Sequence, residues 1–154
     1  NTSIIKTANG KTIMVQHDVN STRPYSRIHL LSGSKAMCRK YPIEMVAFTH
    51  RGGGKRGKEL IPLKRKYEHP LYKRMGAVAK SLGGHGGMDG IMDARLIECL
   101  NNGAPLDQDV YDAAAWSVIA PLSEWSVANR SNSIDVPDFT RGAWKKNTPL
   151  AIVE

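Results

Sequence analysis

The fold of this 154-residue chain is decided near its start, by SIIKTANGKTIMVQHDV (residues 3–19). Two β-rich runs, Ser3–Ala8 and Lys11–Val19, flank the pair Asn9-Gly10. Both turn residues tolerate positive φ, which a tight type I′ turn requires. The stretch therefore predicts a β-hairpin, and antiparallel pairing is the first feature of the fold.

More strands are expected directly after the hairpin. The segment 20–25 contains Pro24 and is expected to be a loop, because proline cannot donate a hydrogen bond within a central strand. Runs 26–31 and 35–41 predict a second strand pair, and 45–48 predicts a short edge strand. Four or five antiparallel strands within about 50 residues indicate one open sheet, and at least one of its faces needs a cover.

The cover is expected to be helical. Apolar residues recur every three or four positions after residue 70, as in Leu71, Met75, Val78, Ala79 and Leu82. This spacing predicts one helix over 70–82, and similar patterns predict others from Met88 to a cap at Gly103 and over 108–129. Pro121 should kink or break the last one. Strands first and helices later predict an α+β fold, with an open, mainly antiparallel sheet covered by helices.

The charge of the chain is concentrated in one segment. The formal net charge is +8, and residues 51–66 contribute seven basic side chains against one acidic. Such runs are usually solvated loops, which is what we expect here. A nucleic-acid-binding module is the alternative, but the segment contains no aromatic residue on which bases could stack.

Several classes of protein are disfavoured by what the sequence lacks. No apolar run is long enough to span a bilayer. No metal-ligand spacing and no Gly-x-Gly-x-x-Gly fingerprint occurs, so neither a metal nor a dinucleotide site is expected in this chain. Cys38 and Cys99 are expected to be buried thiols, although a disulfide stays open. Because the hairpin begins almost at residue 1, we expect a piece of a longer protein.

Two groups of polar residues are candidates for a binding site. The first comprises His17, Arg23, Tyr25 and Arg27, at the end of the hairpin and in the following loop, where binding residues concentrate. Each also has a structural interpretation: His17 as a strand residue bonded across the sheet, Tyr25 as a packing residue, and the arginines as salt-bridge partners.

The second candidate group is His85 with Asp89. Four glycines flank His85, and glycine is entropically costly in a connection that only packs. The segment therefore indicates a close approach of backbone and imidazole to a ligand. As a nucleotide cradle it is weak, because a helix rather than a strand precedes it.

Five segments carry a resemblance to a known family. They are GKTIMVQHDV (10–19), RPYSRIHLLSG (23–33), GGHGGMD (83–89), PLDQDVYDAAAWS (105–117) and PDFTRGAW (137–144). They resemble the carboxy-terminal part of glycoside hydrolase family 109, the α-N-acetylgalactosaminidases with a glucose–fructose oxidoreductase-like fold. The resemblance implies that residues 1–154 form a substrate-facing α/β domain. An upstream NAD-binding Rossmann domain would lie outside this chain.

The family's chemistry, as the resemblance implies it, depends on NAD. The cofactor takes a hydride from C3 of the sugar, and the resulting ketone acidifies the hydrogen at C2. A base removes that hydrogen, the C1 substituent leaves, water adds, and the hydride returns to C3. The substrates implied are glycans that end in N-acetylgalactosamine, and the chain without its upstream part should be inactive.

The resemblance also implies roles for particular residues. Tyr25 matches a sugar-contacting tyrosine, and His17, Arg23 and His85 would bind substrate beside it. His85 is a candidate catalytic residue, whereas the principal catalytic groups and the cofactor-binding residues should lie upstream. Gly90 departs from the family pattern, which has a bulky aromatic residue there. Family members are often exported, so a periplasmic or secreted bacterial protein is expected.

Two alternatives stay open beside the glycosidase. One is a sugar dehydrogenase of the same superfamily, and the other is the basic nucleic-acid-binding module, although we expect no nucleic-acid partner. Self-association through the open sheet face is also expected, because large apolar faces rarely stay bare.

Overall fold

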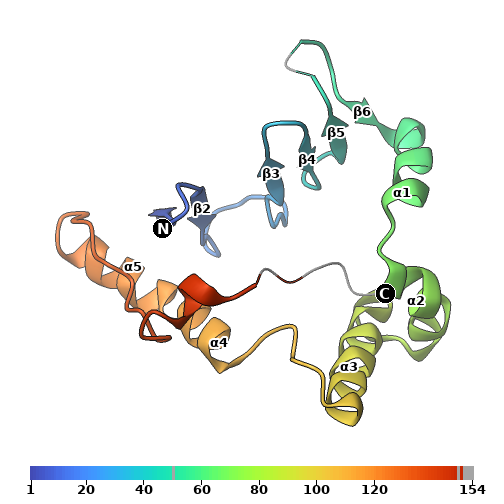
Figure 1. Cartoon of the computed structure of the whole chain (residues 1–154). Coiled ribbons are helices and arrows are strands. Elements are labelled where there is room, and N and C mark those ends of the chain that lie inside the picture. The colour runs from blue at the N-terminus through green and yellow to red at the C-terminus, as the bar shows by residue number, and fades with distance from the viewer. Residues whose placement is uncertain (50, 149, 151–154) are drawn as a thin grey trace. The chain divides into compact units, whose positions relative to one another are not determined.

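A computed structural model describes residues 1–49, 51–148 and 150 of the chain. The chain divides into two compact units (Figure 1). Among the described residues, one unit contains Asn1–Ser21 and residues 92–148 and 150, and the other contains Thr22–Ile91. The division falls within helix α3, Gly84–Asn102, so the amino-terminal hairpin and the last helices belong to the same unit.

The predicted hairpin is present, with a different turn. Strand β1 (Thr2–Lys6) pairs antiparallel with β2 (Thr12–Gln16), with Ile4 opposite Met14. Gly10 has a φ of 75°, and its N–H donates to the carbonyl of Thr7 at 2.9 Å. Asn9 is not among the residues of positive φ. The predicted type I′ turn is therefore wrong: the loop is a three-residue type, in which a left-handed glycine follows a type I turn.

The unit that contains the hairpin also contains two helices where one was predicted. Helices α4 (Val110–Ser117) and α5 (Ile119–Ala128) are separated at Val118. Pro121 accounts for the break, since it has no N–H to donate to the carbonyl four residues earlier. Asp109 begins α4, because its carboxylate accepts from the N–H groups of Tyr111 and Asp112. A short 3-10 helix, η2 (Ala143–Lys146), comes near the end of the described chain.

The other unit contains a four-stranded antiparallel meander. Its strands, in spatial order, are β3 (Leu30–Ser32), β4 (Met37–Arg39), β5 (Met45–Ala47) and β6 (Lys55–Arg56). The hairpin forms a separate sheet, so the single sheet expected from sequence is wrong. Strand β5 is internal rather than at the edge, because β6 pairs with it. Strand β3 is shorter than predicted, and just before it Ile28 takes a φ of 50°, outside the extended range.

The basic segment is not one loop. It forms β6, a 3-10 turn η1 (Gly57–Leu60) and helix α1 (Ile61–Tyr67), and its charged side chains are exposed as expected. Leu60 is the buried residue of this segment, at 2% exposure.

Helix α2 (Pro70–Leu82) has the predicted bounds, and its junction with α3 contains the apolar cluster of this unit. Leu71, Ala79 and Ile91 form the cluster, and Met75 packs against it. Val78 and Leu82, predicted for the same stripe, are exposed. The helix proper of α3 begins near Met88, as predicted, because residues 85–87 are not helical.

The fold class is confirmed: the chain is α+β, with open antiparallel sheets. Among the described residues, the buried hydrophobic ones are Leu60, Leu71, Ala79, Ile91 and Cys99. Both cysteines are free, but Cys38 is exposed, so only Cys99 meets the prediction of a buried thiol. Cys38 is the exposed residue of the three-residue strand β4, between the half-buried Met37 and Arg39.

Candidate functional site

The four residues predicted to face a sugar are divided between the two units. His17 lies in the unit that contains the hairpin, and Arg23, Tyr25 and His85 lie in the other. Each group is therefore described within its own unit.

Tyr25 is the centre of a group of aromatic and basic side chains. Its ring is 72% exposed and meets Tyr41 edge-on, with ring centroids 6.1 Å apart. His29 meets the same Tyr41 ring at 6.0 Å. Tyr25 is thus partly a packing residue, but most of its surface is open to a ligand.

Arg27 fixes the position of the Tyr25 hydroxyl. Its Nε donates to that oxygen, and its guanidinium lies 5.8 Å from the centroid of the ring. The hydrogen bond to Tyr25 raises the pKa of the Arg27 guanidinium, and the electrostatic effect of Tyr25 adds to it. A guanidinium has five N–H donors, so this pair offers an oriented phenol together with further donors for a ligand oxygen.

Asp18 and His17 end the hairpin. The backbone N–H of His17 donates to the carbonyl of Asn1 at 2.9 Å, which extends the β1–β2 pairing by one position. This is the cross-strand role considered from the sequence, and the side chain is exposed. The Asp18 carboxylate accepts from the N–H groups of Asn20 and Ser21, so it organises the turn that leaves the hairpin.

His85 and Asp89 form a direct pair. The Nδ1 of His85 lies 2.9 Å and 3.0 Å from the two carboxylate oxygens of Asp89, and both side chains are substantially exposed. A carboxylate at Nδ1 orients the ring and leaves Nε2 on the opposite side, where it is able to exchange a proton with a ligand. The pair has the chemistry of an oriented acid or base.

The glycines around His85 have a structural cause that the sequence did not reveal. Residues 83–87 all have positive φ, including His85 at 45° and Gly87 at 97°. A Cβ on Gly87 would lie 2.6 Å from the backbone nitrogen of Lys80 in α2. The glycines therefore let the chain reverse and α3 approach α2, so their number does not by itself indicate a ligand site.

Gly90 belongs to the same close approach. A Cβ at this position would lie 3.5 Å from the Cβ of Ala79, an ordinary contact. A methyl group would fit there, whereas an aromatic ring would meet α2. The departure from the family pattern is thus matched by a small residue on the facing helix.

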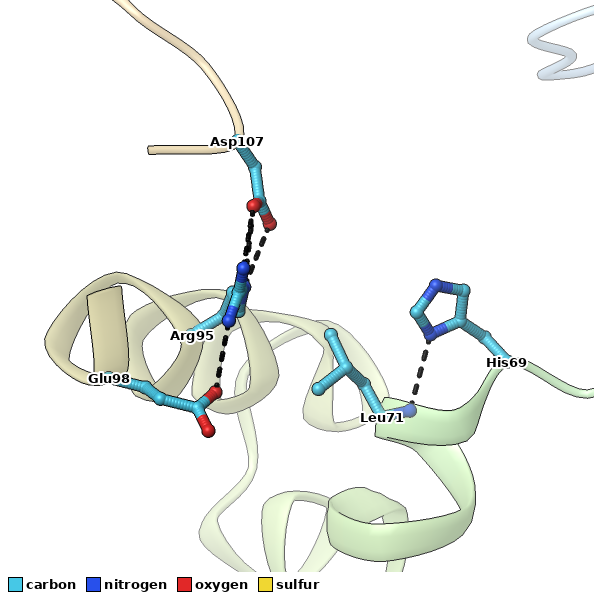
Figure 2. Close-up of polar contacts among 5 residues, drawn as sticks. All are labelled: His69, Leu71, Arg95, Glu98 and Asp107. Carbon is cyan, nitrogen blue, oxygen red and sulfur yellow. Dashed lines mark hydrogen bonds and ion pairs between the residues drawn. The ribbon is translucent and has the colours of Figure 1, made fainter. Parts of the chain in front are cut away.

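Figure 2 shows two polar contacts that sequence reasoning missed. In one unit, the half-buried Arg95 binds Asp107 through Nε and Nη2, at 3.1–3.3 Å, and Glu98 through Nη1 at 3.3 Å. The hydrogen bond to Asp107 is the main cause that raises the pKa of Arg95. In the other unit, the Nδ1 of His69 accepts from the N–H of Leu71 at 3.2 Å and caps α2. The His69 contact caps the start of α2, and the contact between Arg95 and Asp107 joins α3 to the segment that follows it.

Asp138 organises the segment before η2. Its carboxylate accepts from the hydroxyl and N–H of Thr140, the N–H of Gly142 and the indole N–H of Trp144. The hydrogen bond from the Thr140 hydroxyl is the main cause that lowers the pKa of Asp138, and burial opposes it. An Asp two residues before a threonine is a sequence signal for such a turn.

The glycine run 83–87 does not have the geometry of a dinucleotide-binding loop. The glycine run 83–87 connects two helices, and the space beside Gly87 is filled by the α2 backbone. Among the described residues, no group of three or more His, Cys, Asp or Glu side chains lies close enough together to hold a metal ion. Among the same residues, no helix combines the length and the apolar character needed to cross a bilayer.

These features define the class of the chain: an α+β domain with open antiparallel sheets and exposed aromatic, basic and imidazole side chains. The chain belongs to glycosyl hydrolase family 109, since the family model described as "Glycosyl hydrolase 109, C-terminal domain" matches residues 1–146. The predicted resemblance is confirmed.

Similar proteins agree with this assignment. A glycosyl hydrolase family 109 protein of Shewanella amazonensis is 53% identical over 156 residues, covering 100% of this chain and 34% of that protein. One from Shewanella putrefaciens is 54% identical over 157 residues, with 99% and 34% covered. The chain spans about a third of the length of the curated relatives it matches.

Proposed function

We propose that the full-length protein is an NAD-dependent glycosidase that releases terminal α-N-acetylgalactosamine, and that this chain forms its sugar-facing surface. The observation that carries the proposal is the family match over residues 1–146. The exposed Tyr25 phenol, oriented by Arg27, supports the second part, because aromatic and guanidinium groups together suit a hydroxyl-rich ring.

Each residue of the proposed sugar-facing surface has its own task. Tyr25 presents its ring face and hydroxyl to the sugar, and Arg27 is the positioning residue that holds that hydroxyl. His85 takes or gives a proton at Nε2, with Asp89 holding the ring. Arg23 supplies a further polar contact to the substrate.

The cofactor belongs, in this proposal, to the remaining two-thirds of the protein, in a Rossmann domain outside this chain. When bound, NAD would accept a hydride from C3 of the sugar and later return it. No residue of this chain is proposed to bind NAD. Exposed apolar side chains on the strands support a covering domain: Ile4, Met14, Leu30 and Leu31 are all exposed. This chain without that domain would be inactive.

The test uses the full-length protein and a nitrophenyl N-acetyl-α-galactosaminide. We expect steady release of nitrophenol with no net accumulation of reduced cofactor, because the hydride returns to the sugar in each turnover. Reduced cofactor formed in proportion to product would instead identify a sugar dehydrogenase. Absence of both reactions would contradict the proposal.

A further inference from the structure

A hollow lies at one end of the four-stranded sheet. In an antiparallel meander, the end of β3 that leads to β4 and the end of β5 that leads to β6 lie on the same side, and Figure 1 shows the β3–β4 turn there. Residues of this turn, together with residues of β4, β5 and β6, line an open hollow of about 450 Å³. Ligand pockets typically have volumes of about 300–1,000 Å³, so this one has room for a sugar unit.

The charged side chains that line the hollow are basic. Lys35 comes from the β3–β4 turn and Arg56 from β6, and no Asp or Glu occurs among the described residues that line it. The Nε of Arg56 lies 3.4 Å from the Sδ of Met45, which also lines the hollow. The guanidinium is therefore held at the wall, and the local potential favours an anion.

The remaining lining suits a sugar ring better than a bare ion. Phe48 is 50% exposed and offers one aromatic face. Ser32 and Thr49 provide hydroxyl groups. A Cβ built on Gly53 would meet nothing within 4 Å, so the backbone there is open to close approach by a ligand.

We propose that this hollow binds an anionic sugar unit, with Lys35 and Arg56 on its carboxylate or sulfate and Phe48 against its ring. The occupant is a uronic acid or sulfated residue of the glycan from which N-acetylgalactosamine is released. This role rests on the proposed glycosidase function and names its substrate class. A nucleic acid fits less well, because one aromatic ring offers no succession of stacking platforms.

The test measures binding to the full-length protein by calorimetry at low and physiological salt. The probes are N-acetylgalactosamine α-joined to glucuronic acid, N-acetylgalactosamine α-joined to a sulfated galactose, each through a carbon linkage that is not cleaved, and N-acetylgalactosamine alone. We expect both disaccharides to bind more tightly than the monosaccharide, and the difference to shrink with salt. The disaccharide that binds more tightly shows whether the hollow prefers a carboxylate or a sulfate.

Variants locate the site. Lys35→Ala with Arg56→Ala should weaken disaccharide binding by about ten- to a hundredfold, since two charge-assisted contacts are lost. Lys58→Ala with Arg65→Ala removes the same charges from exposed positions outside the hollow and should change binding less than about twofold. If the double variant does not fold, Lys35→Glu alone is the test. This change lies on an exposed turn and should also weaken disaccharide binding.

Three results would overturn the inference. They are disaccharides binding no better than the monosaccharide, equal losses from the hollow pair and the control pair, or duplex DNA binding as tightly as the disaccharides. Cleavage of the uncharged nitrophenyl substrate should be unchanged by Lys35→Ala and Arg56→Ala. In the wild-type protein, normal cleavage without any preference for the disaccharides contradicts this site alone, whereas preferential disaccharide binding without cleavage contradicts the proposed function.

Discussion

Two glycine-rich segments of this chain do opposite things. At Gly87 a methyl group would lie 2.6 Å from the α2 backbone, whereas at Gly52 and Gly53 it would meet nothing within 4 Å. Gly87 allows two helices to touch, and Gly52 and Gly53 leave the wall of a hollow open, although a Cβ on the next residue, Gly54, would lie 2.4 Å from the Cγ of Met45. Glycine content alone therefore does not identify a ligand site, because the neighbours of each missing Cβ decide its role.

The largest expected effect is that of Gly87→Ala. The new methyl group meets the Lys80 backbone, and alanine at a φ of 97° is strained. Left-handed strain and overpacking together should destabilise the α2–α3 junction by roughly 2–5 kcal/mol. Hydrogen exchange of peptides from α2 and α3 in the full-length protein would measure the loss.

Gly86→Ala is the matched control for that change. It has a similar positive φ of 73°, but a Cβ there meets nothing within 4 Å. Only the conformational strain should remain, about 1–2 kcal/mol. Equal losses for the two variants would show that α3 does not approach α2 as described.

His85→Gly distinguishes the role of the imidazole from the role of the left-handed backbone at this position. Glycine relieves the positive φ of 45°, so the turn should be at least as stable, while the ring paired with Asp89 is lost. We expect about a hundredfold lower kcat on an N-acetyl-α-galactosaminide, within the range for acid–base groups. Wild-type turnover together with an intact turn would leave His85 a purely structural residue.

Gly53→Ala should have a much smaller effect on stability. Its φ is not in the left-handed region and its surroundings are open, so the change in unfolding free energy should stay within about 0.5 kcal/mol. Hydrogen exchange of peptides spanning β5 and β6 checks this. A loss comparable to that of Gly87→Ala would remove the distinction between the two segments.

The smallest expected effect is the pH dependence of the turn around Asp138, whose carboxylate accepts a hydrogen bond from the N–H of Gly142 at 2.7 Å. The folded pKa of Asp138 is lowered, so its contribution to stability is present above its ordinary value of 3.8 and is lost as the pH falls through the folded value. The indole N–H signal of Trp144 should report this local loosening in acid. Asp138→Asn should abolish the titration, and an unchanged titration in that variant would assign it to another group.

Much of the fold was predictable because local chemistry determines it. Pro70 and Gly83 bracket α2, and the prediction of that helix was correct at both ends. The turn type of the hairpin was not predictable, because Asn9 tolerates either sign of φ. Strand β6 was missed because two basic residues carry no apolar alternation and form a strand only by pairing with β5.

The candidate site was less accessible to sequence reasoning. The pairing of His85 with Asp89 depends on a left-handed turn that only coordinates reveal. The orientation of Tyr25 by Arg27 follows from a loop without regular structure. The hollow joins residues about 20 positions apart, Lys35 and Arg56, which become neighbours only through the register of the meander.

The central claim is that this chain provides the surface that contacts the sugar, and Tyr25→Phe in the full-length protein tests it most directly. Losing the oriented hydroxyl should lower kcat/KM on the uncharged nitrophenyl N-acetyl-α-galactosaminide by about ten- to a hundredfold, as for a hydrogen bond that involves a charged group. Tyr67→Phe, an exposed tyrosine on α1, should leave kcat/KM unchanged. Wild-type kcat/KM in the Tyr25 variant, or an equal loss in both, would contradict the claim.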